Sequence, residues 1–168
     1  MITTMADPTG RDSSRVRPLV IGVGNPDGGD DGIGPAVVEH LRRRRDDLDT
    51  VIVTGDLTVL PLLWRDRDDV VVVDACRTGR SPGSVVTLDP ADLEADDALS
   101  SHGVGVGYAI ALGGRLGWLP RRLRVVGIEV GDVMAGPLGD RLARQVGTLA
   151  GRLVPLVSEG QGPSSLFR

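Results

Sequence analysis

Four consecutive valines, Val70 to Val73, constrain the fold of this chain more than any other feature. The run shows no polar alternation, and β-branched side chains favour extended backbone, so it predicts a strand buried on both faces of a sheet. A strand of that kind needs other elements packed above and below it. The chain is therefore expected to be an α/β protein, with Asp74 ending its most buried strand.

Shorter apolar segments predict the rest of the fold. Further strands are expected at 19–23, 51–53, 84–88 and 123–128, and helices at 35–45, 59–64, 102–116 and 138–153, with Ser100 or Ser101 capping the third helix. Strands that alternate with helices predict a single-domain three-layer α/β/α sandwich with a mostly parallel, twisted sheet of about five strands. The strand at 84–88 follows its predecessor without room for a helix, which leaves it free to run antiparallel at an edge. The acidic residues between 89 and 97 are interpreted as a polar linker.

The length of 168 residues favours one domain, which we expect at 18–157. The segments 1–17 and 158–168 are interpreted as a disordered N-terminal tail and a loose C-terminal tail. A net charge of −4 argues against a nucleic-acid partner, and no apolar run approaches the ~20 residues that span a bilayer. The single cysteine, Cys76, excludes an internal disulfide and favours the cytoplasm.

Three groups of residues with metal-binding potential are expected at the carboxyl ends of the strands. They are the glycine-rich loop that carries Asp31, then Asp74, and then His102 at the start of a helix. In sheets of this kind, ligands bind where loops leave the carboxyl ends of the strands. Two carboxylates and an imidazole form a donor set that Zn or Ni accepts, so these residues predict an open metal site.

Each of these features also has a simpler interpretation. The glycine-rich loop could cradle a phosphate, although its carboxylates oppose an anion. Asp30 or Asp31 could cap the following helix, and Asp74 could accept hydrogen bonds from a loop. His102 could be structural. Cys76 lies near the proposed site as either a nucleophile or an inert packing residue.

Four sequence motifs, taken in order, resemble those of the hydrogenase maturation proteases, which process the large subunit of nickel-iron hydrogenases. The resemblance extends from about Pro18 to Leu156. The motifs are Ile21-Gly22-Val23-Gly24-Asn25 with Asp31-Gly32-Ile33-Gly34, Val73-Asp74-Ala75 followed by Gly79 and Pro82-Gly83, Ser101-His102-Gly103, and Val126-Gly127-Ile128-Glu129.

The resemblance implies an endopeptidase that removes a C-terminal extension from the large-subunit precursor after nickel has been inserted. It also implies that the nickel belongs to the client and serves recognition, with Asp31, Asp74 and His102 as its ligands. Asp31 is the candidate for activating water. The implied client-binding residues are Gly24, Asn25, Gly55 and Asp56. This chain departs from the family in a more polar first loop and in Thr54-Gly55-Asp56, where Gly-Gly-Thr is common, so the particular client stays open.

Three other functions stay open on the sequence. The chain could be a non-cleaving, nickel-sensing chaperone for the same client. It could be a related peptidase with another protein client, as in spore germination. It could also be a nucleotide-binding α/β domain that uses the Gly24 loop.

Overall fold

The computed structural model describes residues 17–95, 105–131 and 135–158, and its centre is a five-stranded sheet. The strands lie in the order β2-β1-β3-β5-β4, and only the β4–β5 pair is antiparallel. Their bounds are β1 Leu19–Val23, β2 Asp49–Val53, β3 Asp69–Cys76, β4 Val85–Leu88 and β5 Arg122–Glu129. The predicted three-layer fold is confirmed, including the antiparallel edge strand.

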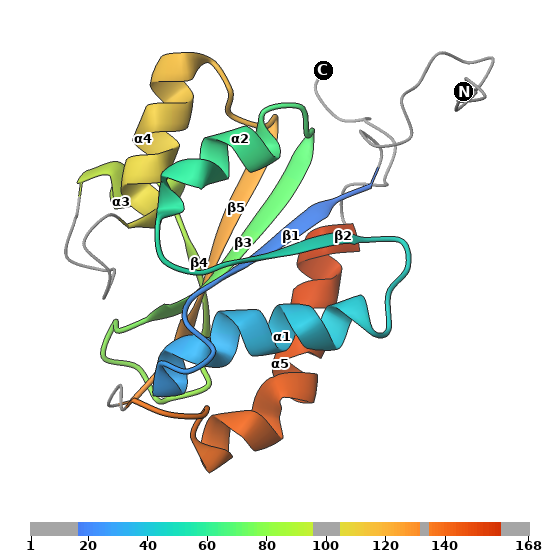
Figure 1. Cartoon of the computed structure of the whole chain (residues 1–168), viewed down its shortest axis with the longest axis vertical. Coiled ribbons are helices and arrows are strands. Elements are labelled where there is room, and N and C mark those ends of the chain that lie inside the picture. Colours follow the sequence, from blue (N-terminus) through green and yellow to red (C-terminus); the bar gives the residue numbers. More distant parts are fainter. Residues whose placement is uncertain (1–16, 96–104, 132–134, 159–168) are drawn as a thin grey trace, which may run out of the picture.

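Helices cover both faces of the sheet (Figure 1). Their bounds are α1 Ile33–Arg42, α2 Leu60–Trp64, α3 Pro90–Ala95, α4 Val106–Leu116 and α5 Asp140–Ser158, with short 3₁₀ turns η2 at Gly29–Gly32 and η3 at Leu57–Val59. Helices α1 and α5 lie on one face and α2, α3 and α4 on the other. No helix in the described ranges is long and apolar enough to cross a membrane.

The valine run divides its side chains between two cores, as its lack of alternation predicted. Val71 and Val73 belong to the core under α1 and α5, whereas Val70 and Val72 belong to the core under α2 and α4. All four are fully buried. Strand β3 is thus the central strand, buried on both faces. The loops at its carboxyl end are anchored to a well-packed strand.

Several predicted boundaries were wrong. Strand β3 does not end at Asp74 but pairs with β5 as far as Cys76, opposite Glu129. The acidic stretch from residue 89 is not wholly a linker, because α3 begins at Pro90 and Asp89 accepts a hydrogen bond from the Ala91 N–H at 2.9 Å. Helix α5 continues past 153 to Ser158, with Pro155 inside it. The predicted tails fall almost entirely outside the described residues, at 1–16 and 159–168.

Candidate functional site

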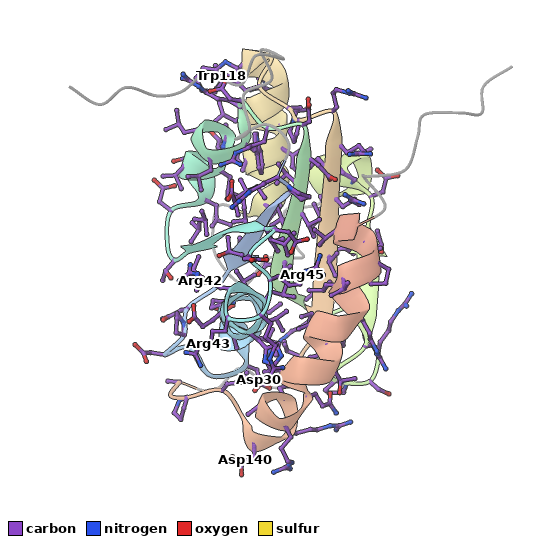
Figure 2. All side chains as sticks on the ribbon, turned by 90° about the vertical axis from the view of Figure 1, so that its right-hand side faces the viewer. Asp30, Arg42, Arg43, Arg45, Trp118 and Asp140 are labelled. Atoms are coloured by element: carbon purple, nitrogen blue, oxygen red, sulfur yellow. The ribbon has the colours of Figure 1, made fainter. Side chains whose placement is uncertain are left out.

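The carboxyl ends of the four parallel strands lie at one edge of the sheet, which we call the carboxyl edge. Four segments leave this edge: 24–32 after β1, 54–56 after β2, 77–84 between β3 and β4, and the residues after β5. Figure 2 shows Asp30 and Asp140, which belong to segments at this edge, at the lower end of the molecule, and Trp118, which precedes β5, at the upper end.

Asp31 is a buried carboxylate at the carboxyl edge. Only 2% of its surface is exposed, and its Oδ2 accepts a hydrogen bond from the Asn25 N–H at 2.7 Å. Gly24 makes this arrangement possible because its φ is +133°, and a Cβ at this position would collide with the carbonyl oxygen of Asp31. The Gly24-Asn25 sequence therefore folds the loop back onto Asp31.

Gly34 brings the first turn of α1 against the ends of two strands. A Cβ on Gly34 would lie 2.5 Å from the carbonyl oxygen of Val23 and 2.6 Å from that of Val73. Because Asp31 lies just before Gly34 and Asp74 just after Val73, this close approach brings the two acidic segments to neighbouring strand ends. Asp74 is half-buried, and its Oδ1 accepts a hydrogen bond from the Ala75 N–H at 2.8 Å.

The predicted histidine ligand, His102, lies outside the described residues. The helix expected to begin there instead begins at Val106, with Gly105 as its N-cap, so Ser100 and Ser101 do not cap it. The glycines at 103 and 105 disfavour an earlier helix start. Within the described ranges, no three His, Cys, Asp or Glu side chains are grouped closely enough to hold a metal ion.

Three of the four predicted client-binding residues lie together. Gly24, Asn25 and Gly55 line a cleft of about 140 Å³ between the loops after β1 and β2, with Val23, Thr54 and Leu57 completing its lining. The Thr54 hydroxyl donates to the Gly24 carbonyl at 3.1 Å, and the Gly24 N–H donates to the Val53 carbonyl at 3.1 Å, which joins the two loops. Asp56 does not line this cleft, and its Oδ1 accepts from the Thr58 N–H at 2.9 Å at the start of η3.

Three N–H groups of the glycine-rich loop donate to acceptors within the protein. Asn25 donates to Asp31, Asp27 donates to the Asn25 side chain, and Gly28 donates to the Asn25 carbonyl. Gly32 is the N-cap residue of α1, so neither Asp30 nor Asp31 occupies the N-cap position itself. A phosphate cradle needs N–H groups that point at the ligand. The N–H groups of Asn25, Asp27 and Gly28 are therefore not available to a phosphate.

A backbone latch connects this loop to the segment after β5. The Gly29 N–H donates to the Gly136 carbonyl at 2.7 Å, and the Gly136 N–H donates to the Asp27 carbonyl at 2.8 Å. Asp30 adds a side-chain contact, because its Oδ1 accepts from the Gly139 N–H at 3.2 Å. The polar, glycine-rich first loop is thus hydrogen-bonded to the segment at Gly136 and Gly139.

Glu129 is a second buried carboxylate at this edge, and no role for it was predicted from the sequence. It is 2% exposed, and it accepts hydrogen bonds from the Thr78 N–H, the Thr78 hydroxyl at 2.6 Å and the Gly79 N–H at 3.0 Å. Burial alone would raise the pKa of Glu129, but these hydrogen bonds outweigh it and hold the pKa below its ordinary value. Glu129 therefore fixes the start of the segment that follows β3.

Comparison with known proteins identifies the family. A family model described as hydrogenase maturation protease, HycI, matches residues 35–155. The chain belongs to the hydrogenase maturation protease family. The hydrogenase expression/formation protein HupD of Rhodobacter capsulatus is 30% identical over 140 residues, a region that covers 77% of this chain and 66% of HupD.

Two solved structures share the fold of this chain. The hydrogenase maturating endopeptidase HybD from E. coli has a TM-score of 0.74 and 24% identity, covering 86% of this chain and 94% of its own. The [NiFe] hydrogenase maturation protease HycI from Thermococcus kodakarensis KOD1 has a TM-score of 0.68 and 21% identity, covering 84% and 92%. Asp74 and His102 lie within the family match, whereas Asp31 lies just before it.

Cys76 is expected to be unreactive in this member of the family. Burial, reinforced by the negative charge of Glu129, raises the pKa of its thiol to about 12, and its surface is 3% exposed. A thiol with this pKa is almost wholly protonated at pH 8, so alkylation by iodoacetamide should be at least about 100-fold slower in the folded protein than in urea. Rapid labelling of the folded protein at pH 8 would contradict this prediction and support Cys76 as a nucleophile.

Glu129 is expected to make this family member sensitive to acid. Because its folded-state pKa lies below the ordinary value of 4.5, the ionised carboxylate stabilises the fold above about pH 4.5. This contribution is lost as the pH falls through the folded-state pKa. Replacing Glu129 with Gln should lower the free energy of unfolding at pH 7 by about 2 kcal/mol and reduce its decline between pH 5 and pH 3.

Urea unfolding followed by circular dichroism at pH 7, 5 and 3 measures this effect. Glu39→Gln is the matched control, because Glu39 forms its ion pairs with Arg42 and Arg43 on the surface. That control should change stability by less than about 1 kcal/mol. Equal pH profiles for Glu129→Gln and the unmodified protein would contradict the assignment.

Proposed function

We propose that this protein is an endopeptidase that removes the C-terminal extension of the nickel-iron hydrogenase large-subunit precursor once nickel has been inserted. Family membership supports the reaction class and the client. The observation that carries the proposal is that Asp31, in the loop after β1, and Asp74, near the end of the adjacent strand β3, each accept a hydrogen bond from a backbone N–H.

Nickel enters this proposal as part of the substrate. Carboxylate oxygens and an imidazole nitrogen suit a nickel ion, and hydrogen bonds to ligand side chains orient them toward a metal. Asp31 and Asp74 fit that donor set, with His102 as the third ligand. Three protein ligands leave coordination positions for groups of the client, so cleavage becomes linked to completed nickel insertion.

Hydrolysis of the peptide bond needs a water molecule, a base that accepts its proton, and an acid that protonates the leaving amine. Asp31 is our candidate for the base, because it is a buried carboxylate that is hydrogen-bonded to Asn25, which lines the cleft. The cleft at Gly24, Asn25 and Gly55 would receive the client chain, and Asp56 would contact the client outside it. The single, reduced cysteine suits a reaction in the cytoplasm.

The test is a processing assay with nickel-loaded and nickel-free forms of the same precursor, analysed by mass spectrometry. We expect trimming of the loaded precursor only, and loss of trimming in His102→Ala. Equal trimming of both forms would contradict nickel recognition while leaving the peptidase activity. Binding of the loaded precursor without trimming would instead support the non-cleaving chaperone, and trimming of an unrelated client alone would support the related peptidase.

A further inference from the structure

We propose that Arg77 and Arg80 form a carboxylate-binding pair that docks an acidic group of the client beside the carboxyl edge. This inference rests on the proposed function, because it names a specificity element for the same reaction. The two residues flank Thr78 and Gly79 in the segment between β3 and β4, three and six positions after Asp74.

Hydrogen bonds to Glu129 hold the segment that carries this pair. The Glu129 side chain binds the N–H groups of Thr78 and Gly79, and its backbone carbonyl accepts from the Gly83 N–H at 2.8 Å. The Glu129 N–H also donates to the Ser84 carbonyl at 2.9 Å. Both ends of the segment are therefore held over the end of β5, which gives Arg77 and Arg80 a defined backbone position.

The side chains of this pair, Arg77 and Arg80, are exposed and form no ion pair within the described ranges. Glu129 contacts the intervening Thr78 and Gly79, and its buried carboxylate is already bound by their N–H and O–H donors. In a chain with a net charge of −4, this leaves two exposed positive charges, three positions apart in the sequence, at the edge where the client is expected.

Arginine is well suited to such a role because its planar guanidinium binds a carboxylate through two parallel hydrogen bonds. Exposed charges at an interface mainly accelerate association and make it sensitive to salt. The carboxylate has two sources in a C-terminal extension: acidic side chains near the cleavage site, or the α-carboxylate at the end of the chain. Both present the same group to Arg77 and Arg80.

The test compares two double variants in the processing assay with the nickel-loaded precursor. Arg77→Ala/Arg80→Ala should raise KM about 10-fold at low ionic strength, leave kcat within about 2-fold, and flatten the dependence of KM on salt. Arg77→Lys/Arg80→Lys should recover part of the loss, because it retains the charges. The matched control is Arg115→Ala/Arg121→Ala, which removes two exposed arginines near the opposite edge and should leave KM unchanged.

Two precursor variants distinguish the sources of the carboxylate. Neutralising the Asp and Glu residues of the extension should abolish the difference between the unmodified and double-variant enzymes if side chains bind the pair. Adding a Gly-Ser tail to the extension should abolish it if the α-carboxylate binds, because the tail displaces that group.

Failure of this inference can be told apart from failure of the proposed function. If the unmodified enzyme trims the precursor but the Ala double variant has the same KM and salt dependence, the arginine pair has no docking role and the proposed function stands. If the unmodified enzyme trims no loaded precursor, the proposed function fails and the inference fails with it.

Discussion

Replacing Asp31 with Asn should lower kcat/KM for the nickel-loaded precursor by at least about 100-fold, the loss expected when a metal ligand or a base is removed. The amide oxygen of Asn can still accept the hydrogen bond from the Asn25 N–H, so the loop should keep its conformation. The change therefore removes charge and basicity with little effect on shape. Initial rates of trimming, measured over a range of precursor concentrations, give the comparison.

Asp30→Asn is the matched control for this experiment. Asp30 precedes Asp31 in the same 3₁₀ turn, but it contacts the Gly139 N–H through its side chain and is more exposed. We expect its substitution to change kcat/KM by less than about 5-fold, because the neutral side chain can keep that hydrogen bond. Equal losses in the two variants would show that the acidic loop acts as a whole and that Asp31 has no special role.

Replacing Gly34 with Ala should destabilise the protein by about 3 kcal/mol or more. The added methyl group would meet the carbonyl oxygens of Val23 and Val73 at 2.5 and 2.6 Å, and neither backbone group can rotate away. Relief of this clash requires α1 to move off the ends of β1 and β3, which would also separate the Asp31 segment from Asp74. Urea unfolding should show the loss of stability, and trimming at a temperature where the variant is folded should be reduced.

Gly151→Ala controls for the general effect of a methyl group on a helical glycine. Gly151 lies in α5, is exposed, and has no atom within 4 Å of the position of an added Cβ. Because alanine favours helix over glycine, this change should stabilise the protein by about 0.5–1 kcal/mol. A neutral Gly34→Ala variant would contradict the tight approach of α1 to the strand ends.

Sequence patterns were sufficient for the parts of the fold that depend on local chemistry. The valine run from Val70 to Val73 identified the central strand because burial on both faces leaves no polar position. The short spacing before Val85 allowed an antiparallel strand, since no crossover helix fits there. Gly24 and Asn25 marked the turn after β1, and the structure places them in one cleft with Gly55.

Contacts between distant residues were beyond such patterns. Glu129 and Thr78 lie 51 positions apart, and nothing in either local sequence indicates that they form hydrogen bonds. The end of β3 was misplaced for the same reason, because its last residues are held by pairing with β5 and not by their own propensity. The ligand roles of Asp31, Asp74 and His102 stay predictions, and the family match begins at residue 35, after the first of them.

The backbone latch between the two loops has a consequence for amide hydrogen exchange. The Gly29 and Gly136 N–H groups are each protected by a carbonyl of the opposite loop, so neither can exchange with solvent until the loops separate. The two amides should therefore exchange with one shared opening free energy, although they are more than 100 positions apart in the chain. A client that immobilises the loop before Asp31 would then slow exchange at the approach to α5 by the same factor.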